Sequence, residues 1–434
     1  MSWQSLRLAE WNAGFRKAVR SKLGGDIFAL YSAQGLNYLL PLLVLPYLLR
    51  VLGPARYGSI AFAQAVMGYA VILTEFGFNL SATRAVARAR EDADEISRIF
   101  WSTLAAKGVL LVIAAAAIVL AVLLVPALQE HWNVIGVCGL VVIGSVVLPQ
   151  WYFQGLERMR VMALTQVVSR IIMLLLTFVL VRSADDELRA AAILSMPPLL
   201  AGILGLVAVG FIAPVRFHRP RLIDVRGALA SSWHLFVSGA ATSLYLNSNA
   251  FIIGLVCGDY AVALYSLANR VVLAVFNLLG PVILAVFPRA SLLFGRSLLE
   301  GRDFVRRLSV PLLGAAGLLS ALLLLFAGPI VRLLGGTQYL DSAPVLRMMA
   351  PLPLILAAGT VLAQIVMVNL GLERSLSRIY LGLGLLSLVL LPVLANRYGA
   401  LGGAQSLLVV EVLGPVFMFR AIGRHGFWSR VERP

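Results

Sequence analysis

Six charged residues lie inside long apolar stretches of this sequence, and their chemistry could hold an anion. They are Lys107, Arg170, Arg270, Arg347, Glu75 and Glu411. A charge at the centre of a bilayer costs about 3 kcal/mol on insertion scales, so it usually faces a protein interior or water. The planar donor fork of arginine can bond two phosphate oxygens at once. With both acids ionised, the cations Lys107, Arg170 and Arg270 outnumber them, which predicts a positive interior that attracts an anion.

Two alternatives remain open for these charges. Arg170–Glu411 or Lys107–Glu75 could be buried ion pairs with a purely structural role. Glu75 and Glu411 are also candidates for ion coupling, because burial favours the neutral form of a carboxyl group and brings proton exchange within reach. Arg347 is expected nearer the membrane interface, where its long side chain can extend to water.

Polar residues recur on one face of several apolar stretches, as the wall of an internal cavity requires. Gln166, Arg170 and Thr177 stand at positions i, i+4 and i+11, which places them on one side of a helix. The alternative is that such residues join helices by hydrogen bonds. Besides the charges, the predicted cavity residues are Gln34, Asn37, Asn79, Gln166, Tyr245, Asn249 and Asn277.

The elements that carry these residues are predicted to be membrane-spanning helices. The 434 residues are 60% hydrophobic and 13% charged, and the mean hydropathy is +0.91, whereas a soluble domain has about 25% charged residues. A run of about 20 apolar residues can cross a bilayer as a helix. Twelve spans are predicted, at 27–49, 58–82, 99–125, 133–155, 162–181, 190–213, 231–256, 260–287, 309–331, 343–370, 379–396 and 400–419.

Basic residues alternate between the two sides of this predicted membrane arrangement. Counted from the N-terminus, every second connection belongs to a set that holds 26 Lys and Arg residues, and the remaining connections hold 6. Because cytoplasmic connections carry the excess of Lys and Arg, both termini are predicted to be cytoplasmic. The same bias explains the net charge of +16 without a nucleic-acid partner.

Six spans in each half indicate an all-α integral membrane protein with two parallel six-helix bundles, a known transporter architecture. The predicted parts are a basic amphipathic segment at 1–25, an N-terminal bundle at 26–213, a basic cytoplasmic linker at 214–230, a C-terminal bundle at 231–423 and a cytoplasmic tail at 424–434. The segment at 1–25 is interpreted either as an interfacial helix on an anionic leaflet or as a disordered basic tail.

Prolines and cysteines complete this description. Pro149, Pro197 and Pro351 are among the prolines that interrupt predicted spans and are expected to kink them. Cys138 and Cys257 lie at or near hydrophobic runs, so they indicate neither a disulfide framework nor a metal site. No cofactor is expected.

Whole segments of the sequence resemble a known family. They are NYLLPLLVLPYLLRVLGPARYG (37–58), EFGFNLSATRAVARAR (75–90), PQWYFQGLERM (149–159) with SRI (169–171), and FPRAS (287–291). They are similar to the Wzx-type O-antigen flippases, a polysaccharide transporter family of the MATE-like (MOP) superfamily. The resemblance implies two six-helix bundles in a V around a central cavity. It also implies a protein that is not an enzyme and that moves undecaprenyl-pyrophosphate-linked oligosaccharide from the inner to the outer leaflet of the bacterial cytoplasmic membrane.

The resemblance further implies a cationic cavity that binds the pyrophosphate or an anionic glycan, with alternating access and ion coupling. Lys107, Arg170 and Arg270 fit the cationic role, and Glu75 and Glu411 fit coupling less securely. The expected partners are the lipid-linked glycan, membrane lipids and polysaccharide polymerase or assembly proteins, and the protein itself is expected to be a monomer.

Two other functions compete with this interpretation. A drug or small-cation exporter of the same fold would need an acidic cavity, and the excess of deep cations argues against that. A membrane polymerase or ligase for the same glycans would expose catalytic residues on a sizeable outward loop. Here the longest such loop, around 183–190, is short.

Overall fold

The computed structural model describes residues 22–212 and 214–427, and within them the side chains at 22–34, 36–39, 238, 241–247, 281, 284 and 285 are not described. Every regular element in this part of the chain is helical, so the all-α prediction is confirmed. The elements are α2 (Lys22–Glu75), α3 (Phe78–Arg88), α4 (Ala93–Leu124), α5 (Pro126–Gln129), α6 (Trp132–Cys138), α7 (Leu140–Val147), α8 (Gln150–Gly155), α9 (Met159–Leu180), α10 (Glu187–Ser195), α11 (Pro197–Ile212), α12 (Leu222–Asn277), α13 (Gly280–Arg296), α14 (Leu298–Gly335), α15 (Ser342–Met349), α16 (Leu352–Thr360), α17 (Glu373–Tyr398) and α18 (Ala400–Arg424), with the short 3₁₀ helices η1 (Ala184–Asp186) and η2 (Thr337–Tyr339) and the π-helix η3 (Val361–Met367). The predicted segment at 1–25 and the predicted tail at 424–434 lie mostly outside the described residues.

Ten runs of helix among the described residues are long and apolar enough to cross a membrane. They confirm the prediction of a multi-pass membrane protein. One run, Leu40–Arg88, has 49 residues and would measure about 70 Å if it were straight, at ~1.5 Å per residue. Since the hydrocarbon core is only about 30 Å thick, such a run must be divided. The count of twelve spans and their grouping into two parallel six-helix bundles remain predictions.

Glycines break the two longest helices, α2 and α12. Gly53 has φ 73° and ψ 173°, and Gly258 has φ 77° and ψ −178°. Residues with side chains disfavour such positive φ values, whereas glycine adopts them readily. The two breaks lie in the intervals predicted between the first and second spans and between the seventh and eighth.

Several predicted spans are interrupted, and the predicted end of the span at 58–82 was wrong. As expected, Pro149 lies between α7 and α8, Pro197 begins α11 and Pro351 precedes α16. The span predicted at 58–82 is not continuous, because Phe76 and Gly77 both have positive φ and separate α2 from α3. A Cβ added to Gly77 would lie 2.8 Å from the Cβ of Leu235, so this break accommodates the passing α12.

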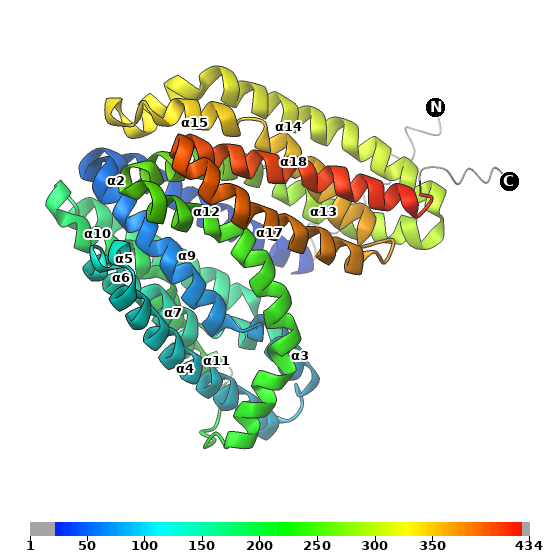
Figure 1. The fold of residues 1–434 in the computed structure, drawn as a ribbon. Coiled ribbons are helices and arrows are strands. Elements are labelled where there is room, and N and C mark those ends of the chain that lie inside the picture. Colours follow the sequence, from blue (N-terminus) through cyan, green and yellow to red (C-terminus); the bar gives the residue numbers. More distant parts are fainter. Residues whose placement is uncertain (1–21, 213, 428–434) are drawn as a thin grey trace.

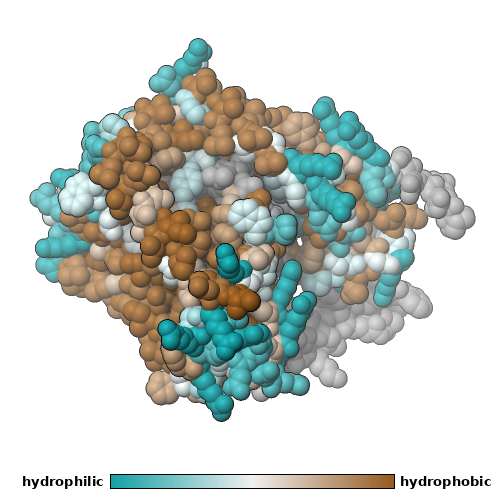
Figure 2. Space-filling model, turned by 60° about the horizontal axis from the view of Figure 1, so that its bottom comes forward, coloured by the Kyte–Doolittle hydropathy of each residue, from teal (hydrophilic) through white to brown (hydrophobic). Residues whose placement is uncertain are grey.

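The helices form two groups that diverge from the end where they meet (Figure 1). α4–α11 gather on one side and α13–α18 on the other, while α2 and α12 run between them and pack on each other. The largest buried core lies along this packing, with Leu49 and Phe62 of α2 and Ile253 and Leu267 of α12 among its members. Large apolar side chains are exposed on the outer faces, where Figure 2 shows a broad hydrophobic surface suited to lipid.

The packing of α2 on α12 requires glycine at position 58, because a Cβ added to Gly58 would lie 1.9 Å from the carbonyl oxygen of Asp259. We expect Gly58→Ala to force the helices apart and to lower the free energy of unfolding by about 1–3 kcal/mol, measured by unfolding of the purified protein in detergent. Gly68→Ala is the control, because its Cβ would meet nothing within 4 Å; it should be neutral or stabilising by about 0.5–1 kcal/mol. Equal losses in the two variants would contradict the close-contact role of Gly58.

Candidate functional site

Arg170 and Arg270, which are far apart in the sequence, line one cavity of about 360 Å³. Arg170 comes from α9 and Arg270 from α12, and Gln64 of α2 and Gln166 of α9 add two amide groups. The rest of the wall is apolar and consists of Pro41, Val141, Leu148, Met173, Leu194, Pro197, Pro198 and Ala201. The prediction that these two arginines share an interior site is therefore supported by their geometry.

Arg270 is held by neutral groups. Its Nη2 donates to Oε1 of Gln64 at 3.3 Å, and its guanidinium carbon lies 5.6 Å from the centre of the Tyr57 ring. Among the described residues, no carboxylate lies within 4.0 Å of it. A ring face and an amide oxygen stabilise a cation without cancelling its charge, so Arg270 presents its positive charge to the cavity.

Arg170 and Gln166 reach the cavity from successive turns of α9, as their i, i+4 spacing predicted. Thr177, which the same spacing placed on this face, has a different role. It is fully buried and donates to the carbonyl of Met173 at 2.8 Å. Thr177 therefore bonds within its own helix, which neither the cavity prediction nor the alternative of hydrogen bonds between helices described.

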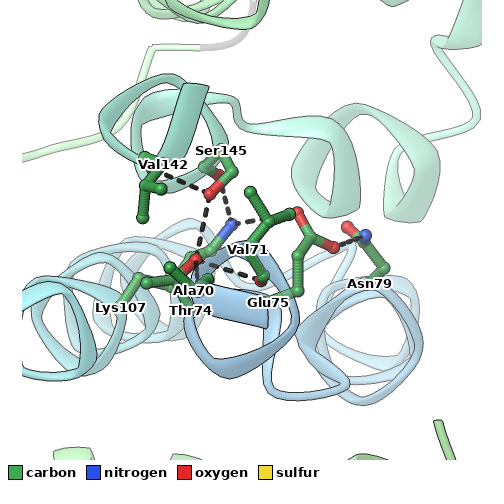
Figure 3. Close-up of polar contacts among 8 residues, drawn as sticks. All are labelled: Ala70, Val71, Thr74, Glu75, Asn79, Lys107, Val142 and Ser145. Atoms are coloured by element: carbon green, nitrogen blue, oxygen red, sulfur yellow. Dashed lines mark hydrogen bonds and ion pairs between the residues drawn. The ribbon is translucent and has the colours of Figure 1, made fainter. Parts of the chain in front are cut away.

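Lys107 does not line this cavity, contrary to its predicted grouping with the two arginines. Its side chain is 1% exposed and its Nζ lies 3.8 Å from Oε1 of Glu75, which is 29% exposed. The same Nζ donates to the carbonyl oxygen of Ser145 at 2.6 Å, and Thr74 and Ser145 join their hydroxyls at 3.0 Å. Asn79 donates its amide to the other carboxylate oxygen of Glu75. Figure 3 shows this cluster where α2, α4 and α7 pack together.

The ion-pair interpretation therefore holds for Lys107 and Glu75. The cause is the local packing, because α2 passes a carboxylate beside Lys107, whose buried ammonium group needs a counter-charge. Asn79, predicted as a cavity residue, instead belongs to this cluster through its bond to Glu75.

The remaining predicted residues lie elsewhere. Arg347, predicted with the cationic cavity residues, does not line the cavity and is exposed in the last turn of α15. Glu411 of α18 is close enough to Tyr265 and Tyr380 to affect them electrostatically, and it is not part of the cavity wall. Asn249 is buried with no partner for its Oδ1 among the described residues, and Asn277 is half-buried at the end of α12. The side chains of Gln34, Asn37 and Tyr245 lie outside the described part of the chain.

Comparison with known proteins identifies the family. The family described as "Polysaccharide biosynthesis protein" matches residues 23–294. A "Putative O-antigen transporter" of Escherichia coli (strain K12) is 34% identical over 391 residues, which cover 89% of this chain and 94% of the relative. A protein of the same name from Shigella dysenteriae is 32% identical over 400 residues, covering 92% of this chain and 99% of the relative. The chain belongs to the polysaccharide biosynthesis protein family.

Solved structures share the fold of this family member. An inward-facing multidrug resistance MATE transporter of the MOP superfamily has a TM-score of 0.68 at 12% identity, covering 91% of this chain and 99% of its own. The lipid II flippase MurJ in an inward closed conformation has a TM-score of 0.72 at 10% identity, covering 92% and 89%. Both solved structures confirm the fold that the sequence resemblance implied, and both curated relatives carry the name of a transporter.

At one end of the molecule, polar contacts tie the two helix groups together through the central helices α2 and α12. We define this closed end by Arg50, His131, Asp259 and Gln338. Nε2 of His131 bonds Oδ2 of Asp259 at 2.7 Å, Nε2 of Gln338 donates to the carbonyl of Leu49 at 2.9 Å, and Arg50 donates to the carbonyl of Leu333. No spacing signals such contacts, because their partners are more than a hundred residues apart in the chain.

Both ring nitrogens of His131 face acceptors. Nδ1 donates to the carbonyl of Ala127 at 2.8 Å while Nε2 bonds Asp259, so the doubly protonated ring satisfies every bond. The hydrogen bond to Asp259, reinforced by the Ala127 carbonyl and the nearby Glu130, raises the pKa of His131 to about 9 despite partial burial. His131 thus adds a cation–carboxylate link between the groups near neutral pH.

The ion pair of Lys107 and Glu75 predicts strong coupling between variants. Glu75→Gln leaves a buried ammonium without a counter-charge, so it should lower the free energy of unfolding by about 3 kcal/mol. Lys107→Met should cost less, since Glu75 is partly exposed to water. The double variant should regain at least about 1 kcal/mol relative to Glu75→Gln, measured by unfolding in detergent. Additive losses would show that the two residues act independently.

The contact between His131 and Asp259 at the closed end should contribute less stability in alkaline solution. A group whose folded pKa is raised contributes stability that is fully present below its unfolded pKa and is lost as pH rises through the folded value, here about 9. The unfolding temperature of the wild type should therefore fall more steeply between about pH 7 and 10 than that of His131→Gln. Parallel pH profiles would mean that the Asp259 contact carries no charge.

Proposed function

We propose that this protein is a flippase that moves an oligosaccharide linked to undecaprenyl pyrophosphate from the inner to the outer leaflet of the bacterial cytoplasmic membrane. The observation that carries the proposal is the cavity in which Arg170 of α9 and Arg270 of α12 meet. The family and the names of the two curated relatives support a polysaccharide substrate.

The pyrophosphate is the part of such a substrate that fits the cavity. Two guanidinium groups repel each other, and an anion that bridges them removes this repulsion while accepting several charge-assisted bonds. The apolar wall lowers the local dielectric constant around these bonds, which strengthens them. Sugars can extend from the pyrophosphate into open space, and the polyprenyl chain can stay in the lipid throughout, so only the polar part has to cross.

The same arrangement suggests how binding drives alternating access. Arg170 belongs to the first half of the chain and Arg270 to the second, so a bridging anion ties the halves together. When the halves rock apart, each arginine keeps its own neighbours, the bridge is lost and the anion is released. A ligand that contacts both halves only in one arrangement shifts the equilibrium toward that arrangement.

The proposed orientation places the closed end outside. Arg50, His131, Asp259 and Gln338 all lie in connections that are poor in Lys and Arg, which positive-inside bias assigns to the outer face. Both termini are then cytoplasmic, and the divergent ends of the helix groups face the leaflet where lipid-linked units are assembled.

We assign ion coupling to Glu75, with Glu411 as the second candidate. Protonation of Glu75 would leave Lys107 without its counter-charge in a buried place, so proton binding would alter the packing of α2 on α4 and α7. The protein is proposed to act as a monomer that delivers its substrate to polysaccharide polymerase or assembly proteins. A multidrug exporter of the same fold remains the second candidate, favoured only by the similarity to a MATE structure.

The cavity arginines should be required for polymer display. In a host that lacks its own copy, Arg170→Gln and Arg270→Gln should each restore about 10-fold less surface polysaccharide than the wild type, or less still, because each loses a charged bond to phosphate worth about 1.5–3 kcal/mol. Arg347→Gln, which removes the same charge outside the cavity, should restore display fully.

Two results would contradict this assignment. Full display with both cavity variants would remove the anion-binding role of Arg170 and Arg270. Resistance to cationic dyes on expression, without any effect on the glycan, would favour the drug exporter.

A further inference from the structure

The connector between α11 and α12 and the first turns of α12 combine exposed apolar side chains with arginines. Phe217, Leu222 and Ile223 are 76%, 84% and 75% exposed, and they alternate with arginines along the chain. We call the following seven residues the connector surface: Arg216, Phe217, Arg219, Arg221, Leu222, Ile223 and Arg226. Figure 2 shows hydrophilic side chains gathered at this end of the molecule with hydrophobic ones beside them.

The connector is held against α4 rather than extending freely. The backbone N–H of Arg216 donates to Oγ of Ser97 at 3.1 Å, and the indole N–H of Trp101 donates to the carbonyl of Arg216 at 3.0 Å. The ring of Phe217 packs edge-on against Trp101 with centroids 5.1 Å apart. These bonds fix the direction in which the connector presents its other side chains.

The connector begins where a membrane span ends. α11 ends at Ile212, which is also the end of the apolar run Ala184–Ile212, so the residues that follow emerge at the level of the lipid headgroups. Largely exposed phenylalanine, leucine and isoleucine are unfavourable in water, but at this level they can enter the acyl region while arginines reach the phosphates above.

Most of the positive charge on this surface is not neutralised by the protein. Within the described part of the chain, Arg219, Arg221 and Arg226 have no carboxylate within 4.0 Å. Arg216 lies 3.3 Å from Asp94, but both side chains are about four-fifths exposed, and such pairs contribute little. The surface therefore keeps its attraction for anionic headgroups.

We propose that the connector surface binds anionic phospholipids of the adjacent leaflet, with Arg219, Arg221 and Arg226 on the headgroup phosphates and Phe217, Leu222 and Ile223 among the acyl chains. The connector leads directly into α12, the helix that carries Arg270, so the bound lipids anchor the start of that helix against α4. This site is separate from the cavity, and its existence does not depend on the proposed transport function.

The test compares lipids on the purified full-length protein in detergent. Added phosphatidylglycerol should raise the unfolding temperature of the wild type more than phosphatidylcholine does. The triple variant Arg219→Gln, Arg221→Gln, Arg226→Gln should lose at least half of that difference. The matched control Arg306→Gln, Arg307→Gln, Arg374→Gln removes the same charge from exposed positions in the other half. It should keep the full difference between the effects of the two lipids.

A second variant tests the contribution of the apolar side chains of the connector surface. Phe217→Ser with Leu222→Ser leaves every arginine in place, and it should also reduce the effect of phosphatidylglycerol. Equal effects of the two lipids on the wild type, or equal losses in the two arginine triples, would overturn the proposal. An equal shift with inorganic phosphate would assign the surface to a soluble anion instead, which would also overturn it.

Discussion

The close approach of α2 to α12 beside Gly58 and Asp259 is the contact on which the cavity depends. Tyr57 and Gln64 lie just before and after this contact on α2, and Arg270 lies about three turns beyond it on α12. Because both helices are rigid, their contact sets the height at which the tyrosine ring and the amide meet the guanidinium. A side chain at Gly58 would displace the α12 backbone and with it Arg270, which lines the cavity together with Arg170.

Lys107 and Arg270 both lie inside predicted spans, but the groups that surround them differ. Lys107 meets a carboxylate and a carbonyl, so its charge is compensated and its site is part of the packing of α2, α4 and α7. Arg270 meets an amide and a ring, which stabilise it while leaving its field intact. A charge can thus be tolerated in an apolar surrounding either by neutralisation or by neutral polar contacts, and only the second leaves a site for an anion.

Local pattern predicted most of the fold. Apolar runs predicted a multi-pass membrane protein, and Pro149, Pro197 and Pro351 marked breaks in its helices, because the bilayer thickness and the conformational limits of proline act on short segments. The break at Phe76–Gly77 was not predicted, although glycine readily adopts the positive φ found there. Its cause is the passage of Leu235 on another helix, a contact that residue spacing does not encode.

By itself, the sequence determined that the chain spans a membrane and that charged and polar residues stand inside its apolar stretches. It also determined the likeness to O-antigen flippases, because that likeness resides in contiguous segments. Only the tertiary structure decided which charges meet. Arg170 and Arg270 share a cavity, Lys107 is neutralised by Glu75, and His131 joins Asp259 across the closed end. The reason is that periodicity fixes the face of a helix on which a residue lies, whereas its partner depends on how two helices are placed, which packing between distant segments decides.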